Sequence, residues 1–379
     1  MKTSEAAGSR RAWIEKALSL IDADFQRSAD THLIPLKLEG FPKLDFYLKD
    51  ESSHPTGSLK HRLARSLFLY ALVHGWLKPG APVIEASSGS TAVSEAYFAR
   101  LLGLEFIAVM PSSTQKEKID RIVFYGGRTH LIEDPSKIVE ESRALALRTG
   151  GHFLDQFTYA ERATDWRANN NIADSIFRQM AHEPHPIPSW IVSSAGTGGT
   201  LATLGRYVRY RQHSTQVLGA DPERSVFYDA FVTGDRTLVS DHGSRIEGIG
   251  RPRVEPSFLP EILDAMVKVP DALSFGAMHW LSDKLGRKVG PSTGTNFVGA
   301  LVAASEMAQN RQAGSLVFVL CDGGERYTAT ANDPAWLASQ GFDLARCRSV
   351  VERCAVSGKP LMSSTQPGSA LGLTRLQEP

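Results

Sequence analysis

The sequence predicts an α/β protein whose sheets are mainly parallel and covered by helices on both faces. Three observations predict this class. Short apolar segments alternate with segments of helical periodicity along most of the chain. The expected strands are mainly apolar throughout, which is typical of strands buried on both faces. Runs of glycine, serine and threonine follow several of these strands, at the sheet edge where such folds bind ligands.

The first predicted helix covers residues 58–80 and follows a Pro-Thr-Gly-Ser bend. Leu59, Leu63 and Leu67 recur at a spacing of four and are expected to face the core, while Ser58 is the expected N-cap. Further elements are expected in this order: strand 81–87, helix 92–103, strand 105–110, helix 114–127, strand 128–134, helix 135–151, strand 152–157, a strand, glycine loop and helix within 189–212, strand 216–222, and a late strand that begins at 314.

Composition and charge exclude several classes of partner. The 379 residues are 42% hydrophobic and 22% charged with a net charge of +1, so neither a nucleic acid nor an anionic membrane surface is expected as a partner. The three cysteines, Cys321, Cys347 and Cys354, lack metal-ligand spacing and fit a reducing cytoplasm. The N-terminal segment has no apolar signal core, and no stretch approaches the roughly 20 apolar residues of a membrane span. A cytoplasmic protein without a metal is expected.

A glycine-rich turn lies between a predicted strand and a predicted helix and contains Gly196, Thr197, Gly198, Gly199 and Thr200. Glycines let the backbone approach a ligand, several N–H groups can converge on one anion, and threonine hydroxyls add donors, so the natural ligand is a phosphate. The alternative is a tight turn without a ligand. The spacing matches neither the G-x-G-x-x-G motif of dinucleotide sites nor the G-x-x-x-x-G-K motif of ATP sites, which disfavours both.

Two other runs of small residues precede predicted helices. Ser88, Gly89, Ser90 and Thr91 form a nest that suits a carboxylate, with helix capping as the alternative explanation. Ser292 offers a hydroxyl to a ligand heteroatom at the start of another helix, or it caps that helix.

Lys60 lies on the first turn of the 58–80 helix, where unpaired N–H groups and the helix dipole favour anions. A single lysine in such a place reaches solvent by default. The combination is more informative, because a lysine, a phosphate cradle, a carboxylate nest and a serine are the groups with which a pyridoxal phosphate enzyme holds an amino acid as a Schiff base.

Five motifs in order resemble those of fold-type II pyridoxal phosphate enzymes, the cysteine synthase and cystathionine β-synthase family, whose fold is tryptophan synthase β-like. They span most of residues 30–330. They are the lysine motif HPTGSLKHR, the substrate loop SSGSTA, the phosphate loop GTGGT, the mobile-loop motif IEGIG at 246–250 and the late-strand motif GERY at 324–327. The resemblance implies two three-layer α/β/α domains and bound pyridoxal 5'-phosphate.

The resemblance also assigns roles to residues. Lys60 is the Schiff-base and catalytic lysine, Gly196 to Thr200 hold the cofactor phosphate, and Ser292 faces the pyridine nitrogen. Ser90 is placed at the cofactor, where it replaces a family asparagine, so the hydrogen bond to the ring hydroxyl is weaker or passes through water; Ala92 replaces a glycine. The residues implied at the substrate are Ser87, Ser88, Gly89, Thr91 and Gln156.

Residues 158–177, TYAERATDWRANNNIADSIF, resemble the L-cysteine desulfhydrase branch of the family. The family architecture implies a smaller mobile substrate-binding domain at residues 49–160 and a large cofactor-binding domain at 1–48 and 161–350. Residues 355–379 are expected to form a disordered tail because they are rich in Ser, Gly and Pro. A homodimer is implied as well.

The activity implied is α,β-elimination of L-cysteine to hydrogen sulfide, pyruvate and ammonia. Lys60, displaced by the substrate amine, would take the Cα proton as general base. A neutral Ser292 at the pyridine nitrogen favours loss of a β leaving group over transamination. Two alternatives remain. One is β-replacement by a second nucleophile, as in cysteine synthase or cystathionine β-synthase; the other is a non-catalytic binding protein of this fold, against which the presence of Lys60 argues.

Overall fold

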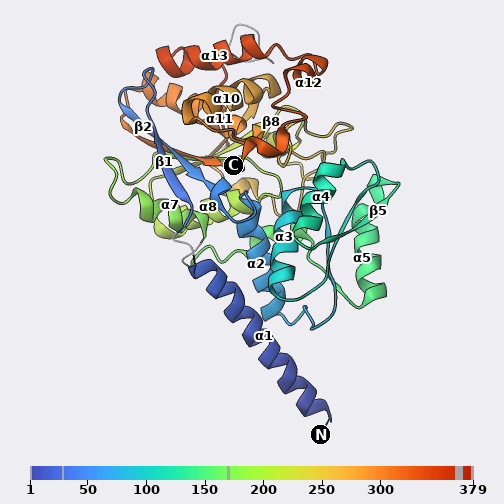
Figure 1. The fold of residues 1–379 in the computed structure, drawn as a ribbon. Coiled ribbons are helices and arrows are strands. Elements are labelled where there is room, and N and C mark those ends of the chain that lie inside the picture. Colours follow the sequence, from blue (N-terminus) through green and yellow to red (C-terminus); the bar gives the residue numbers. More distant parts are fainter. Residues whose placement is uncertain (1, 28–29, 169–170, 363–369, 377–379) are drawn as a thin grey trace. The chain divides into compact units, whose positions relative to one another are not determined.

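The computed structural model describes residues 2–27, 30–168, 171–362 and 370–376. Contacts divide the chain into two compact units. Unit 1 consists of Met1–Asp30 and His54–Thr164, and unit 2 of Thr31–Ser53 and Asp165–Pro379. Each unit is built around its own sheet with helices packed on it, which confirms the predicted α/β class (Figure 1).

Unit 1 contains a four-stranded, fully parallel sheet in the order β5-β4-β3-β6. Its strands are β3 (Val83–Ala86), β4 (Phe106–Pro111), β5 (Arg128–Ile132) and β6 (His152–Phe153). Its helices are α1 (Lys2–Gln26), α2 (Lys60–Val73), α3 (Ser90–Leu101), α4 (Lys116–Phe124), α5 (Ile138–Thr149) and α6 (Gln156–Ala163).

Successive strand residues in unit 1 serve opposite faces of the sheet. Val83 and Phe106 belong to a core shared with α2 and α3. Their neighbours Ile84 and Ile107 pack in a second cluster, with Leu145 of α5. Helices therefore cover both faces, as the near-continuous apolar strands predict.

Unit 2 contains a seven-stranded sheet in the order β1-β2-β10-β7-β8-β9-β11. The five central strands are parallel, and β1 and β11 pair antiparallel at the edges. The strands are β1 (His32–Leu36), β2 (Leu44–Asp50), β7 (Trp190–Ser193), β8 (Gln216–Pro222), β9 (Ala265–Val269), β10 (Gly314–Leu320) and β11 (Thr374–Arg375). The helices are α7 (Ile172–Met180), α8 (Gly199–Arg211), α9 (Phe227–Thr233), α10 (Asp271–Leu285), α11 (Pro291–Gln309), α12 (Pro334–Ser339) and α13 (Leu344–Ser357).

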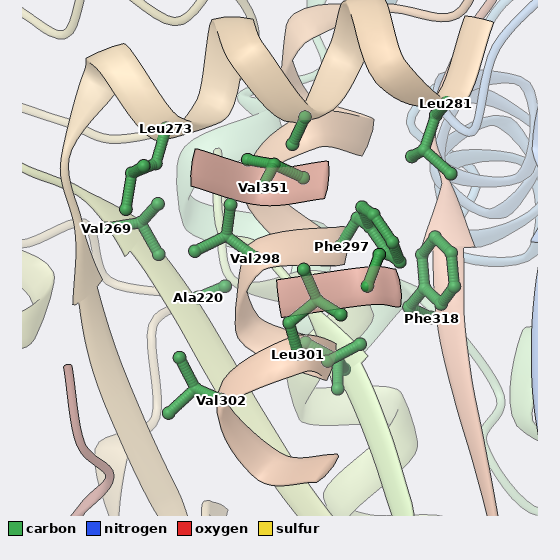
Figure 2. Close-up of a cluster of buried hydrophobic side chains, with 14 of the residues drawn as sticks. Ala220, Val269, Leu273, Leu281, Phe297, Val298, Leu301, Val302, Phe318 and Val351 are labelled. Atoms are coloured by element: carbon green, nitrogen blue, oxygen red, sulfur yellow. The ribbon is translucent and has the colours of Figure 1, made fainter. Parts of the chain in front are cut away.

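Helix α11 is the most deeply buried helix of unit 2 and lies between the sheet and helix α10. Phe297 of α11 is fully buried, and its ring centroid lies 5.3 Å from that of Phe318 (Figure 2). The Trp280 ring centroid lies 5.4 Å away. Two glycines allow the close approach: a Cβ on Gly294 would lie 2.0 Å from the Ser274 carbonyl oxygen, and one on Gly299 2.9 Å from a Val192 methyl carbon. On the opposite face of the sheet, α8 contacts β7 and β8.

Three local predictions are wrong. Helix α2 ends at Val73 and not near residue 80, because the chain turns at Gly75, which has a φ of 66°. Ser58 does not cap helix α2, because the helix begins at Lys60 with Leu59 at the N-cap, and the Ser58 hydroxyl is buried without a hydrogen-bond partner among the described residues. The strand expected at 152–157 is only two residues long. Asp155 ends it, because this residue adopts a left-handed conformation (φ 52°) and its side chain caps α6.

The compact units differ from the predicted domains at the N-terminus. Residues 1–30 group with unit 1 because Ala17 and Ile21 of α1 pack into the core formed by α2 and α3. Of the predicted tail, residues 363–369 and 377–379 lie outside the described residues; α13 extends to Ser357, and β11 pairs with β9. The mobility of residues 49–160 and the assignment of substrate and cofactor to separate domains stay predictions.

No helix in the described ranges has both the length and the hydropathy that crossing a membrane requires. The same residues contain no group of three or more His, Cys, Asp or Glu side chains that could hold a metal ion.

Replacing Phe297 by alanine should lower the free energy of unfolding by about 3–5 kcal/mol, because the change opens a cavity between α10, α11 and the sheet. Urea unfolding followed by tryptophan fluorescence measures the effect. The control is Val232→Ala, at a side chain that is 53% exposed, which should change stability by less than about 0.5 kcal/mol. Equal stability of the two variants would contradict the importance of this contact.

Candidate active site

Lys60 is the first residue of helix α2, directly after a tight bend. Gly57 makes the bend possible with a φ of 73°, and its N–H donates to the His54 carbonyl oxygen at 2.7 Å. On the other side of Lys60, the His61 ring lies 5.0 Å from the His54 ring, centroid to centroid. The backbone around the lysine is therefore held from both sides.

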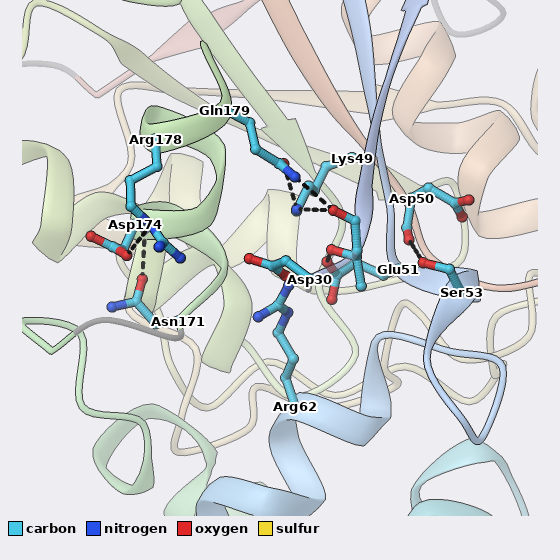
Figure 3. A network of polar contacts seen from close by, with 11 residues as sticks. Asp30, Lys49, Asp50, Glu51, Ser53, Arg62, Asn171, Asp174, Arg178 and Gln179 are labelled. Carbon is cyan, nitrogen blue, oxygen red and sulfur yellow. Dashed lines mark hydrogen bonds and ion pairs between the residues drawn. The ribbon is translucent and has the colours of Figure 1, made fainter. Parts of the chain in front are cut away.

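The start of α2 is also tied to helix α3. The buried Thr56 hydroxyl lies 3.1 Å from Nδ1 of His61 and 2.8 Å from the Ser94 hydroxyl. The guanidinium of Arg62 is buried and pairs with Asp30 at 2.8 Å (Figure 3). These contacts of unit 1 position the lysine on a well-packed helix end.

The serine nest lies between β3 and α3 of unit 1. Gly89 is the N-cap of α3 and makes no side-chain cap, so capping by these serines is not what the structure shows. Ser87 accepts the Gly89 N–H at 3.2 Å, and the Ser88 hydroxyl has no hydrogen-bond partner among the described residues. The first turn of α3 therefore presents backbone N–H groups and a hydroxyl to an anion.

Gln156 joins this nest from a distant part of the chain. It is the first residue of α6, and its Oε1 accepts the Thr91 hydroxyl at 2.8 Å. Because Oε1 is used in this way, the amide NH₂ is the end of the side chain that remains for a ligand. The five residues predicted to bind the substrate thus lie together in unit 1. They are Ser87, Ser88, Gly89, Thr91 and Gln156.

The glycine loop of unit 2 joins β7 to α8. Gly198 is the N-cap of α8, with a φ of 99° and no side-chain cap, and a Cβ there would lie 2.3 Å from the Ser257 carbonyl oxygen. The Gly199 N–H donates to the Thr197 hydroxyl at 3.3 Å. The Ser194 hydroxyl, just before the loop, is buried without a hydrogen-bond partner among the described residues. The loop combines an uncapped helix start with an unused buried hydroxyl, which suits a phosphate.

Ser292 occupies the second position of α11 in unit 2. Gly290 is the N-cap and makes no side-chain cap, so Ser292 does not cap the helix. Thr293 accepts the Cys321 N–H at 3.1 Å, and Asn296 donates to the Val319 carbonyl oxygen at 2.7 Å. These two bonds fasten the start of α11 to the end of β10, and the neutral Ser292 hydroxyl is held there without a hydrogen-bond partner among the described residues.

The IEGIG and GERY segments also belong to unit 2. Gly250 donates its N–H to the Ala195 carbonyl oxygen at 2.7 Å, which places the IEGIG segment against the glycine loop. In the GERY segment, the buried Tyr327 hydroxyl donates to Asp322 at 2.5 Å. Burial raises the pKa of Tyr327, and the neighbouring Asp322 carboxylate raises it further, so this hydroxyl stays protonated.

A buried lysine stabilises the segment of unit 2 that precedes Lys60 in sequence. Lys49 is fully buried on β2 and donates to the Thr31 carbonyl oxygen at 2.8 Å and to Gln179 of α7 at 2.7 Å (Figure 3). Thr31 in turn donates to Glu51 at 2.7 Å. These bonds join both ends of residues 31–53 to α7.

The two units divide the predicted site residues between them. Lys60, Ser90, the nest and Gln156 belong to unit 1, whereas the glycine loop and Ser292 belong to unit 2. Sequence reasoning missed two buried carboxyl groups next to the nest, Glu85 and Glu95. Their signal was present, since each glutamate interrupts an otherwise apolar strand or helix face.

The chain is similar to known proteins over most of its length. A family model described as pyridoxal-phosphate dependent enzyme matches residues 26–322. The chain is 57% identical to L-cysteine desulfhydrase Cds1 of Mycobacterium tuberculosis over 339 residues, covering 88% of this chain and 92% of that protein. It is 26% identical to a cysteine synthase of Dictyostelium discoideum, covering 83% of this chain and 85% of that protein.

Among solved structures, a hydrogen sulfide-producing enzyme from Fusobacterium nucleatum is similar, with a TM-score of 0.71, 25% identity and coverage of 82% of this chain and 90% of that one. These findings confirm the resemblance inferred from the five motifs and its closeness to the desulfhydrase branch. The chain belongs to the pyridoxal-phosphate dependent enzymes.

Proposed function

We propose that this protein is a pyridoxal phosphate-dependent L-cysteine desulfhydrase, a carbon-sulfur lyase that converts L-cysteine to hydrogen sulfide, pyruvate and ammonia. The 57% identity to a protein named L-cysteine desulfhydrase, over 88% of the chain, carries the proposal. The similar fold of a hydrogen sulfide-producing enzyme supports it.

The donors of unit 2 fit pyridoxal 5'-phosphate. Residues Gly196 to Thr200 would hold the phosphate, because the uncapped start of α8 supplies N–H groups and Gly198 leaves no room for a side chain. The neutral hydroxyl of Ser292 suits the pyridine nitrogen. Ser90 of unit 1 is assigned to the cofactor only through the family resemblance. When bound, the cofactor supplies an electron sink for a carbanion at Cα of the amino acid.

Unit 1 would supply the base and the substrate contacts. Lys60 would hold the cofactor until the substrate amine displaces it, and its free amine would then take the Cα proton. The substrate carboxylate would bind the first-turn N–H groups of α3, the Ser88 hydroxyl and the amide NH₂ of Gln156. Loss of the thiolate from Cβ completes the elimination.

A cysteine synthase or cystathionine β-synthase reaction is the second candidate. It shares the same base and carboxylate contacts and differs in whether a second nucleophile, rather than water, consumes the product of elimination. The 26% identity to a protein named cysteine synthase favours it, but the 57% identity to the desulfhydrase outweighs this.

We also infer a cytoplasmic homodimer that binds neither membrane nor nucleic acid. The family resemblance supports the dimer, and three cysteines that form no disulfide (Cys321, Cys347 and Cys354) suit a reducing compartment. Light scattering coupled to size-exclusion chromatography tests the oligomeric state.

The decisive experiment supplies L-cysteine to the holoenzyme and measures sulfide and pyruvate together, with and without a second thiol. Equal amounts of both products, little changed by the thiol, are expected for the desulfhydrase. Sulfide that appears only with the added thiol, and without pyruvate, would replace this proposal with β-replacement.

Substituting Lys60 by alanine should lower sulfide release by at least about 10²-fold, since both the covalent anchor and the general base are lost. The absorbance of the purified variant should also lack the signal of a lysine-bound cofactor. Lys78→Ala, at an exposed lysine of the same unit, is the matched control and should behave like the wild type. Full turnover by the Lys60 variant would sink the catalytic assignment.

Replacing Gly198 by alanine should weaken binding of pyridoxal phosphate, because the new Cβ collides with the backbone at Ser257 and Phe258 and φ is positive. Cofactor release during dialysis, followed by absorbance, measures the effect. Gly234→Ala is the control, since its φ of 73° is also positive but its Cβ would meet nothing within 4 Å. Equal cofactor retention in both variants would argue against the assigned phosphate loop.

A further inference from the structure

Two glutamates of unit 1 share a fully buried position that the proposed reaction does not use. Glu85 lies on β3, just before the serine nest, and Glu95 lies on α3, just after it. Both side chains are completely buried. Buried carboxyl groups are costly unless they are neutral or fully hydrogen-bonded, so the state of this pair requires a physical explanation.

The hydrogen bonds of the two carboxyls are unequal. Glu85 accepts the Ala86 N–H at 2.8 Å on Oε1 and the Gln156 N–H at 3.1 Å on Oε2. Neither oxygen of Glu95 receives a donor from the described residues. The side chains of Glu85 and Glu95 lie within hydrogen-bonding reach of each other. Two ionised carboxylates cannot form that bond, because neither has a hydrogen to donate.

The surroundings favour a proton on Glu95. Burial raises the pKa of Glu95 well above its usual range, and the neighbouring Glu85 raises it further. Burial also raises the pKa of Glu85 to about 8, although its two backbone donors oppose this. A neutral Glu95 that donates to Glu85 gives the carboxyl proton an acceptor and avoids placing two buried charges side by side.

The other ionisable groups around the pair do not neutralise it. Asp155, which precedes α6, adds negative charge near Glu85, and Arg143 of α5 pairs with Asp155 at 3.2 Å. On β6, burial lowers the pKa of His152 to about 4, which leaves that ring uncharged. On α2, His61 contacts α3 through the Thr56 and Ser94 hydroxyls and through the rings of Tyr97 and Phe98.

The pair is connected to the substrate nest through Gln156. Glu85 holds the backbone N–H of Gln156, and Gln156 accepts the Thr91 hydroxyl. Hydrogen bonds therefore link Glu85 through Gln156 to Thr91 in the first turn of α3, where the carboxylate would bind, and Glu95 lies beside Glu85 at the other end of this series.

We propose that Glu95 is a positioning residue whose protonated carboxyl donates to Glu85 and so holds Gln156 and Thr91 in place for the substrate carboxylate. This inference rests on the proposed function, because the carboxylate site is part of it. Glu95 itself touches neither substrate nor cofactor.

The protonation of Glu95 can be tested through stability. Because folding raises the pKa of both glutamates above 4.5, the folded protein binds more protons than the unfolded chain above that pH. The pair's stabilisation is therefore complete below about pH 4.5 and is lost as pH rises through the folded pKa values. Glu95→Gln keeps an N–H donor for Glu85 and removes one titrating group.

The melting temperature of Glu95→Gln relative to wild-type holoenzyme should therefore increase between pH 5 and pH 8. A difference that stays constant with pH would overturn the protonated state of Glu95, and with it the proposal.

The positioning role needs a second measurement, made with ligands that lack a leaving group. L-alanine and L-alaninamide, which differ in the carboxylate, are titrated against the cofactor absorbance of wild type, Glu95→Leu and Glu95→Gln. Glu95→Leu should raise the Kd of L-alanine about two- to tenfold, the effect of one lost hydrogen bond, and leave that of L-alaninamide unchanged. Glu95→Gln should restore wild-type binding of L-alanine.

Two results would overturn the positioning role: an equal change for both ligands, which indicates general damage to unit 1, or no change for L-alanine. The proposed function fails separately, if the wild type binds L-alanine yet releases no sulfide from L-cysteine.

Discussion

The close packing of helix α11 on the central parallel strands is the constraint on which unit 2 depends. Gly294 and Gly299 remove the side chains that would hold α11 away from α10 and from the sheet. Phe297 then fills the space between them. Because a packed interior tolerates little displacement, the first turn of α11 is fixed relative to the end of β10, and Ser292 is presented from a rigid support.

Two helix starts in unit 2 differ in how the polar groups around them are hydrogen-bonded. In unit 2, the side chains of Thr293 and Asn296 bind backbone groups at the end of β10, which fastens the start of α11 to that strand. The glycine loop instead leaves the start of α8 without a side-chain cap and the Ser194 hydroxyl without a described partner. A helix start without a side-chain cap in a buried loop is suited to bind an anion, which is why the cofactor phosphate is proposed there.

In unit 1, a buried carboxyl group joins two segments of the chain through hydrogen bonds and not through an ion pair. Glu85 receives backbone N–H groups from two segments that are far apart in sequence, and so acts as a joint between β3 and α6. Neither oxygen of the neighbouring Glu95 accepts a hydrogen bond within the described part of the chain, so a retained proton is the simplest way to keep both groups buried. The strained conformation of Asp155, directly before Gln156, shows that the backbone at this joint is held by its surroundings.

The α/β class, the order of the elements between residues 58 and 222, the glycine loop and the position of Lys60 at the start of a helix could be predicted from the sequence, because periodicity and glycine conformation act over a few residues. The predictions at Ser58 and Asp155 are wrong because the neighbouring backbone adopts another conformation: Leu59 takes the N-cap position of α2, and Asp155 caps α6. Which residues join the nest depends on the tertiary structure: Gln156 contacts Thr91, 65 residues away in sequence, and Glu85, 71 residues away. Such pairings depend on how helices pack on a sheet, and no local pattern encodes which side chains then face each other.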